Sequence, residues 1–200
     1  MPSRANYPTP GLRERKKART RAAIQSHALR LFRQHGYQDT TIEQIINAAE
    51  VSETTFFRYF PTKEDVVLQD DFDPLIAQIL LDQPRELSPI QAIRATFRQH
   101  FTQLPPEQHQ QMRDRVSLIT VEPALRAAML DQYSQALQLL ADAVAERTGR
   151  ARDDLAVRTI AGAAIGAMMA TLATLADNPT ADLPTTMDQA FEHLEAGLSL

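Results

Sequence analysis

The sequence predicts an all-α protein of about nine helices, with a small N-terminal domain and a larger C-terminal one. Apolar residues recur at intervals of three and four along most of the chain, and no segment competes with an alternating strand pattern. Glycine is scarce, with 6 in 200 residues, and most of the 12 prolines fall between the helical intervals. A hydrophobic content of 44% is enough for a substantial core.

The first predicted helix ends at Gly36, because glycine most readily adopts the left-handed conformation that closes a helix. Its apolar positions are spaced by three and four residues: Ile24, Ala28, Leu31 and Phe32. A short second helix follows, because Thr40 precedes Glu43 by three residues, the spacing of a capping box. Its apolar stripe can pack on the first helix: Ile42, Ile45, Ile46 and Ala49.

A third helix is predicted to begin near Glu53, after a tight connection made by Glu50, Val51 and Ser52. The Ser52 hydroxyl can accept a hydrogen bond from the first backbone amides of this helix. Two short helices joined by so brief a turn form a helix-turn-helix, whose second helix can enter a major groove about 12 Å wide. The third helix is therefore the predicted reading helix.

The fourth helix is predicted from Lys63 to about Leu81, with Thr62 as its cap and a bend near Pro74. Lys63 lies in its first turn, where the ammonium and nearby amide donors can hold one phosphate. Five further helices are predicted between the prolines and Gly149: residues 89–104, 106–121, 123–148, 153–178 and 186–198.

The helix-turn-helix region resembles the N-terminal domain of the tetracycline-repressor (TetR) family of bacterial regulators. The positions that carry the resemblance are Leu31, Phe32, Gly36, Tyr37, Thr40, Thr41, Val51, Ser52, Thr55, Phe57, Tyr59, Phe60, Lys63 and Glu64. Two positions depart from the family pattern. Glu50 stands where the family usually has glycine, and a bulky residue at positive φ costs about 1–2 kcal/mol. Phe57 replaces a tyrosine, so Tyr59 has to supply any phenol that bonds a phosphate.

The resemblance implies a double-stranded DNA operator as a partner. We predict that Glu53, Thr54 and Phe56 lie near bases, and that Thr41, Thr55, Tyr59 and Lys63 contact phosphates. The full predicted DNA-binding set is Thr40, Thr41, Ser52, Glu53, Thr54, Thr55, Phe56, Phe57, Tyr59, Lys63, Arg13, Lys16 and Lys17.

Charge is divided along the chain in agreement with this interpretation. Residues 1–69 hold 11 Lys and Arg against 7 Asp and Glu, whereas residues 70–200 hold 10 against 18. A basic arm upstream of the first helix suits a phosphate backbone or a narrow minor groove, the alternative being a solvated tail. We therefore predict three parts: a disordered tail at 1–12, a DNA-binding domain with its basic arm at 13–69, and an effector-binding and dimerisation domain at 70–200.

The eighth predicted helix carries a face of small residues: Thr159, Gly162, Gly166, Ala170 and Ala173. Such a face lets another helix approach closely, either within one protomer or between two. The family resemblance implies a homodimer in which the last two helices of each subunit form a four-helix interface. The last helix would contribute Met187, Phe191 and Leu194 to it.

A set of Met, aromatic and aliphatic side chains from four helices is the predicted effector pocket, although each of these residues is also typical of an ordinary core. The set is Phe97, Phe101, Met112, Val116, Ile119, Tyr133, Leu137, Met168, Met169 and Leu172. The stretch from Met112 to Arg126 is similar to a sub-branch of the family with an acyl-CoA-type ligand domain. We therefore expect a hydrophobic or acyl-type effector, with Arg98, Arg115 and Arg126 as candidates for a carboxylate or phosphate.

The other classes of function find less support. There is no cysteine, no metalloprotease spacing of histidines, no Gly-rich phosphate loop and no nucleophile elbow, so we predict neither an enzyme nor a cofactor or metal site. The uncharged stretch at 160–176 is shorter than the roughly 20 residues of a membrane helix, which favours a buried helix. The absence of cysteine fits a cytoplasmic protein. A helical adaptor that binds only protein is the alternative function.

Overall fold

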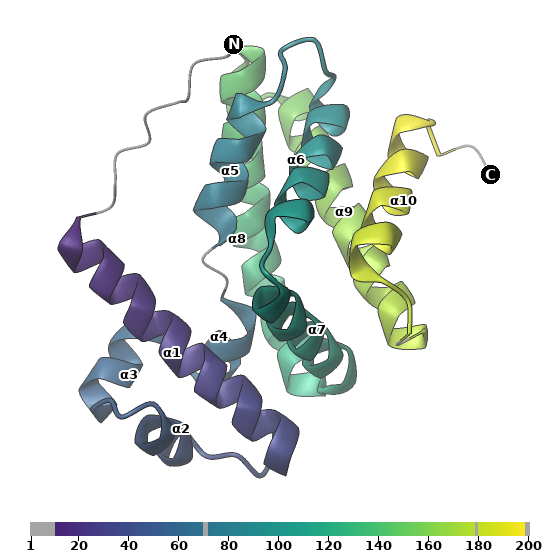
Figure 1. The fold of residues 1–200 in the computed structure, drawn as a ribbon. Coiled ribbons are helices and arrows are strands. Elements are labelled where there is room, and N and C mark those ends of the chain that lie inside the picture. The colour runs from purple at the N-terminus through teal and green to yellow at the C-terminus, as the bar shows by residue number, and fades with distance from the viewer. Residues whose placement is uncertain (1–10, 70–71, 179, 199–200) are drawn as a thin grey trace. The chain divides into compact units, whose positions relative to one another are not determined.

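The computed structural model describes residues 11–69, 72–178 and 180–198, and all its regular elements in these ranges are α-helices (Figure 1). Ten helices are described, one more than predicted, and the all-α class is confirmed. The chain divides into two compact units, Met1–Val66 and Val67–Leu200. The predicted functions of the domains at 13–69 and 70–200 stay predictions.

The first unit contains three complete helices and the start of a fourth: α1 (Leu12–His35), α2 (Ile42–Ala48), α3 (Glu53–Tyr59) and α4 (Lys63–Leu68). α2 contacts both α1 and α3. The side chains at the centre of this unit are almost fully buried: Ile24, Ala28, Leu29, Phe32, Ile45, Phe56, Phe60 and Val66. The apolar spacing of the sequence thus corresponds to the core of a helix-turn-helix unit.

Two of the predicted helix boundaries in this unit depend on a single residue each. Gly36 has a φ of 85° and its amide donates to the Phe32 carbonyl at 2.9 Å, so it closes α1 as predicted. The predicted cap of α2 is wrong by one residue. Thr41, not Thr40, accepts the Gln44 amide at 3.2 Å, and the Gln44 side chain accepts the Thr41 amide at 2.8 Å.

The turn between α2 and α3 has a positive φ at Glu50, although this residue is not glycine. Glu50 has a φ of 52°, the left-handed region that favours glycine, and Ser52 caps α3 by accepting the Thr55 amide at 3.2 Å. Thr62 begins α4, because its hydroxyl accepts the Asp65 amide at 3.1 Å.

The single long helix predicted from Lys63 to Leu81 is wrong. The structure has α4 ending at Leu68 and a separate α5 (Phe72–Asp82). Pro74 is the third residue of α5, where its missing N–H breaks no helical hydrogen bond. A helix running through Pro74 would lose such a bond, so the sequence favours a new start over a bend.

The second unit is built around α9 (Leu155–Asp177), which contacts four of its neighbours (Figure 1). These neighbours are α6 (Pro89–Gln103), α7 (Pro106–Val121), α8 (Pro123–Thr148) and α10 (Leu183–Glu195). α5 packs on α6 and α8. The buried core includes Leu80, Ala92, Ile93, Leu140, Val144, Val157, Ala161, Ala164 and Phe191.

The proline-led helices begin where the sequence predicts, and two later starts differ. α9 is capped by Asp154, whose carboxylate accepts the Ala156 amide at 2.8 Å, one residue after the predicted Asp153. α10 begins at Leu183 instead of Thr186, because Asp182 accepts the Thr185 amide at 3.0 Å. Pro184 then occupies the first turn of α10, a position that suits proline.

Two arginines hold the second unit together. Arg94 on α6 pairs with three carboxylates of α10, at 2.8 Å to Asp188, 3.4 Å to Glu192 and 3.0 Å to Glu195. Arg147 is buried near the end of α8 and donates to the backbone carbonyls of residues 83, 84 and 87. The connection between α5 and α6 is therefore fixed to α8 through main-chain acceptors.

α9 is 23 residues long and apolar enough to cross a membrane by length and composition. The prediction that this segment is too short to cross a membrane is therefore wrong, because the helix extends beyond 160–176 at both ends. Core helices of globular proteins pass the same test, and α9 packs on four other helices.

Candidate DNA-binding surface and effector cavity

The outward face of α3 is the candidate reading surface. Glu53 and Thr54 are exposed in its first turn, and the Phe57 ring is 42% exposed. Ser52 caps this first turn, because its hydroxyl accepts a hydrogen bond from the Thr55 amide and donates one to the Thr55 hydroxyl at 2.8 Å. This leaves a short, capped helix with a carboxylate, a hydroxyl and an aromatic ring accessible.

Two residues predicted to touch DNA are buried instead. The Phe56 side chain is fully buried and packs edge-on against Phe57 at 5.4 Å between ring centroids, so it is a core residue and cannot lie near bases. Thr40 is 1% exposed, and its hydroxyl donates to the Gly36 carbonyl at 2.8 Å, so it cannot contact a phosphate. In both cases the neighbouring residue, Phe57 or Thr41, is exposed, and the sequence alone does not show which of two adjacent side chains faces the core.

The remaining predicted phosphate contacts have accessible positions. Thr41 is exposed at the start of α2, and Tyr59 is half-buried with the Arg58 guanidinium 5.2 Å from its ring centroid. Their contact with DNA stays a prediction. Arg58 is exposed and adds a positive charge beside the phenol.

Lys63 is already engaged within the first unit. Its ammonium donates to the Tyr37 carbonyl at 2.9 Å and the Thr40 carbonyl at 3.2 Å, and it lies 4.2 Å from the centroid of the Tyr37 ring. An ammonium has three donors, so one remains for a phosphate. Lys63 thus joins the segment between α1 and α2 to the first turn of α4.

We expect Lys63→Ala to weaken binding to every DNA sequence alike and to reduce the salt slope by about 0.9, the value of one phosphate contact. Because two part-buried carbonyls lose their donor, the free energy of unfolding should also fall by about 1–3 kcal/mol. Fluorescence anisotropy at several salt concentrations measures the slope, and urea unfolding measures the stability. A lower stability with an unchanged slope would remove Lys63 from the phosphate contacts.

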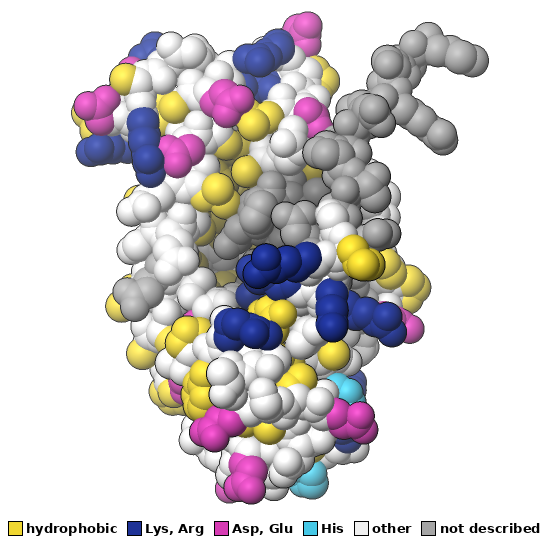
Figure 2. Space-filling model, turned by 90° about the vertical axis from the view of Figure 1, so that its left-hand side faces the viewer, with side chains coloured by type: hydrophobic (Ala, Val, Ile, Leu, Met, Phe, Trp, Pro, Cys, Tyr) yellow, Lys and Arg dark blue, Asp and Glu magenta, His cyan; other side chains and the backbone are white. Residues whose placement is uncertain are grey.

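The basic residues near the N-terminus belong to α1. Arg13, Lys16 and Lys17 are exposed on its first turns, so the expected arm upstream of the helix is helical from Leu12 onward. The tail predicted at 1–12 otherwise lies outside the described residues. In the face drawn in Figure 2, one group of Lys and Arg side chains lies across the middle of the view, and others lie near its top.

The second unit contains an apolar cavity of about 290 Å³, here called the inner cavity. Eight of the ten predicted effector residues line it: Phe97, Phe101, Met112, Val116, Ile119, Tyr133, Met168 and Leu172. They come from α6, α7, α8 and α9. The sequence pattern thus brought together side chains that the fold places around one space.

Two predicted residues lie elsewhere. Met169 is 43% exposed on the outward side of α9, and Leu137 packs against the core without lining the inner cavity. Four further lining residues were not predicted. Met129 and Gln132 on α8 precede Tyr133 and Ala136 at helical spacing and line the same wall, and Val67 and Leu68 are the last two residues of α4.

The inner cavity also has a few polar groups on its wall. His100, Arg115, Gln132 and Tyr133 line it, and no carboxylate does among the described residues. Burial lowers the pKa of His100, and the charge of His109 lowers it further. Burial also raises the pKa of Tyr133, so both side chains are held in their neutral forms.

The lowered pKa of His100 predicts a loss of stability on mild acidification. Between the folded-state pKa and the ordinary 6.5, the unfolded chain binds more protons, so the free energy of unfolding falls as the pH drops through this window. Between about pH 7 and pH 5.5, the thermal midpoint of the wild type should fall further than that of His100→Gln. The hydrogen bond from Arg94 lowers the pKa of Asp188, so protonation of this carboxylate affects stability only under more acidic conditions. An equal fall of the thermal midpoint in the two proteins would contradict the assignment of this pH dependence to His100.

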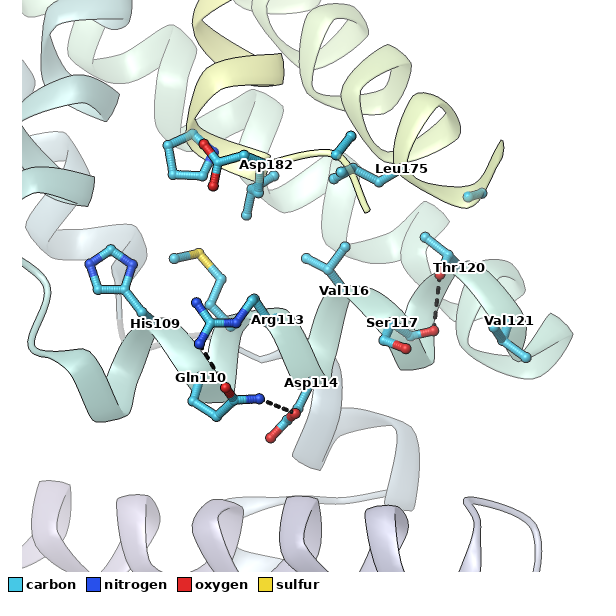
Figure 3. A pocket seen from close by; sticks show the side chains of 15 residues that line it. His109, Gln110, Arg113, Asp114, Val116, Ser117, Thr120, Val121, Leu175 and Asp182 are labelled. Carbon is cyan, nitrogen blue, oxygen red and sulfur yellow. Dashed lines mark hydrogen bonds between the residues drawn. The ribbon is translucent and has the colours of Figure 1, made fainter. Parts of the chain in front are cut away.

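A second hollow, here called the outer pocket, has a volume of about 390 Å³ and lies between α7 and the start of α10 (Figure 3). Its α7 side carries His109, Arg113 and Ser117, and Asp182 and Leu175 lie on the opposite side (Figure 3). Arg113 donates to the Gln110 amide oxygen at 2.6 Å.

The small residues of α9 form an exposed face. Thr159, Gly162, Gly166, Ala170 and Ala173 are all exposed, and a Cβ built on either glycine meets nothing within 4 Å. The predicted partner stripe is wrong for Met187 and Phe191, which are buried against the core of the same protomer at 8% and 0% exposure. Leu194 packs on the same core.

Among the described residues, no group of three His, Asp or Glu side chains is arranged to hold a metal ion.

Comparison with known proteins identifies both units. Residues 24–69 match the family described as bacterial regulatory proteins of the tetR family, and residues 87–199 match the MftR C-terminal domain. Among curated relatives, the chain is 27% identical to the mycofactocin biosynthesis regulator MftR of Mycobacterium tuberculosis, over 92% of this chain and 93% of that protein. It is 43% identical to the regulator TcmR of Streptomyces glaucescens over 48% of this chain and 44%, or less than half, of TcmR. Both relatives are transcriptional regulators.

Solved structures show the same fold. SmeT, the repressor of the Stenotrophomonas maltophilia multidrug efflux pump SmeDEF, matches with a TM-score of 0.58 and 20% identity over 88% of this chain and 89% of SmeT. FadR of Thermus thermophilus, a TetR-family repressor in complex with lauroyl-CoA, matches with a TM-score of 0.53 and 25% identity over 90% of this chain and 95% of FadR.

Proposed function

The chain belongs to the TetR family of bacterial transcriptional regulators, and from this premise we propose that it is a repressor that a small molecule releases from its operator. The effector is a hydrophobic or acyl-type molecule, and the working form is a homodimer on double-stranded DNA. The single observation that carries the proposal is the joint presence of a capped, outward-facing α3 and an apolar cavity of about 290 Å³.

DNA recognition is assigned to α3. Its inner side is anchored in the core by Phe56, which leaves Glu53, Thr54 and Phe57 free to meet base edges and the thymine methyl group. Lys16 and Lys17 on α1 add phosphate contacts, which carry affinity without sequence preference.

Dimerisation is assigned to the exposed face of α9. A row of glycine, alanine and threonine at spacings of three and four residues allows two helices to approach closely. A two-fold dimer presents two reading helices, so the operator is a near-palindrome with half-sites about one helical turn or more apart.

Effector release is assigned to the inner cavity. Its wall includes Val67 and Leu68, the last two residues of α4, whose first residue is Lys63. A molecule that fills the cavity changes the position of these residues and thereby of α4. A difference of about 1.4 kcal/mol in its affinity for the two states changes their ratio tenfold, so a few kcal/mol suffice for release. The triclosan and lauroyl-CoA complexes of SmeT and FadR are consistent with an apolar effector.

Fluorescence anisotropy with DNA from the genomic neighbourhood tests the proposal. We expect tight, salt-dependent binding to one near-palindromic fragment, and release on addition of an apolar acyl compound. Uniformly weak binding with an intact dimer would favour the alternative, a helical adaptor that binds only protein. A cytoplasmic location without membrane attachment is part of the proposal, and cell fractionation tests it.

A further inference from the structure

The inner cavity and the outer pocket share part of their walls. Met112, Val116 and Leu183 line both spaces, so no complete layer of the protein separates them. In Figure 3, Val116 points from α7 toward Leu175 across the outer pocket. Two spaces that share three side chains form one continuous path if those side chains move.

The shared wall contains side chains that can move. Met112 is half-buried and has an unbranched side chain with several rotatable bonds, which adapts easily to a changed neighbour. Leu183 is half-buried and is the first residue of α10, so it follows a short loop and not a packed helix interior. Met112 and Leu183 pack at the edge of the core and are only partly buried, so this wall can open with less loss of packing than the core itself.

The two spaces differ in chemistry. The inner cavity is lined almost entirely by aliphatic, aromatic and methionine side chains, with His100, Arg115, Gln132 and Tyr133 as its polar exceptions. Polar side chains make up a larger share of the outer pocket, seven of its fifteen lining residues: His109, Gln110, Arg113, Asp114, Ser117, Thr120 and Asp182. A molecule that spans both spaces matches them only if one end is apolar and the other is polar.

We propose that the effector is an amphiphile with an anionic head group, whose apolar part fills the inner cavity and whose head binds Arg113 in the outer pocket. This inference rests on the proposed function and names the ligand class of the same site. The apolar part enters through Met112, Val116 and Leu183.

The charge of the head group follows from how the polar groups of the outer pocket are already used. Asp182 caps α10 by accepting the amide and the hydroxyl of Thr185, at 3.0 and 2.7 Å. Asp114 accepts the Gln110 amide at 2.9 Å. Arg113 is exposed, and the one side-chain bond described for it goes to the neutral Gln110 oxygen, which leaves most of its five N–H donors for a ligand. An acceptor with negative charge is the complement of such a group.

Neighbouring arginines are less suited to this role. Arg126 donates to the Thr120 carbonyl at 2.6 Å, and Arg98 pairs with Asp188 at 3.7 Å. Arg115 lines the inner cavity, so it is the rival position for the head group and the test has to distinguish it from Arg113.

Isothermal titration calorimetry with decanoate, decyl phosphate and decanol tests the inference on the full-length protein. We expect both anions to bind wild type at least tenfold more tightly than decanol, and the ratio of the two anions to distinguish a carboxylate from a phosphate head. Arg113→Gln should remove the preference for anions and leave decanol binding unchanged. Arg152→Gln, at an exposed position outside both spaces, is the control with the same loss of charge.

Two further variants make the outcomes separable. Ile165→Phe, which narrows the inner cavity, should weaken all three probes alike. If Arg115→Gln removes the anion preference and Arg113→Gln does not, the head lies in the inner cavity and the inference is wrong, although an effector cavity remains. Equal binding of decanol and decanoate to wild type likewise overturns the inference alone. If no probe binds wild type, both the inference and the proposed effector cavity are contradicted.

Discussion

Phe56→Ala is expected to lower the free energy of unfolding of the DNA-binding unit by about 3–5 kcal/mol, the usual cost of removing a buried phenyl ring. Phe56 is fully buried, and its ring centroid lies 6.1 Å from that of Phe60 and 5.4 Å from that of Phe57. Loss of the ring leaves a cavity beneath the reading helix, so operator binding should disappear together with the fold of this unit. Urea unfolding followed by circular dichroism measures the first effect and anisotropy the second.

Phe57→Ala is the matched control, because the same ring is removed one residue further along α3. Its ring is 42% exposed, so the free energy of unfolding should change by no more than about 0.5 kcal/mol. Operator affinity should fall about tenfold, which corresponds to about 1.4 kcal/mol. If Phe57→Ala destabilised the protein as much as Phe56→Ala, the assignment of the two faces of α3 would be reversed.

Gly166→Leu is expected to convert the dimer into a folded monomer. In the protomer, a Cβ at Gly166 meets nothing within 4 Å, and leucine favours the helix over glycine by roughly 1 kcal/mol, so stability should not fall. In a dimer built on the small face of α9, the leucine side chain holds the two helices apart. Operator affinity should then drop about 10²- to 10⁴-fold, because the second half-site is no longer bound intramolecularly.

Sedimentation velocity and anisotropy measure these effects. Gly166→Ala tests the helix propensity alone and should keep the dimer, since alanine preserves a small face. Gln138→Leu adds the same side chain at an exposed position of α8 and should also remain dimeric. A dimer that survives Gly166→Leu with full operator affinity would place the interface elsewhere.

The sequence predicted helix starts well where a residue has one strong local preference. Gly36 and Gly149 both have positive φ and close helices, and Pro106 and Pro123 begin them. Prediction failed where two residues compete for one role. Thr40 and Thr41 both suit a cap, and only the packing of the Thr40 hydroxyl against the Gly36 carbonyl decides between them.

The lining of the inner cavity was predictable in outline because its residues share a type and a spacing. The sequence does not show which face of a helix points toward the inner cavity. Met168 and Met169 have the same chemistry and adjacent positions, but the 100° step between them places one in the inner cavity and the other 43% exposed. Met187 was assigned to an interface because an amphipathic helix buries its stripe equally well in its own protomer or in a partner.

The charge of the helix-turn-helix has a consequence for how the protein searches DNA. Residues 37–62 hold four acidic side chains against one arginine, whereas the exposed Arg13, Lys16 and Lys17 lie on the first turns of α1. A reading helix that begins with exposed Glu53 is repelled by phosphates until its base contacts form. On the proposed function, we expect the basic turns of α1 to retain the protein near DNA while α3 rejects most sequences. Residence on a site would then depend on recognition more than on charge.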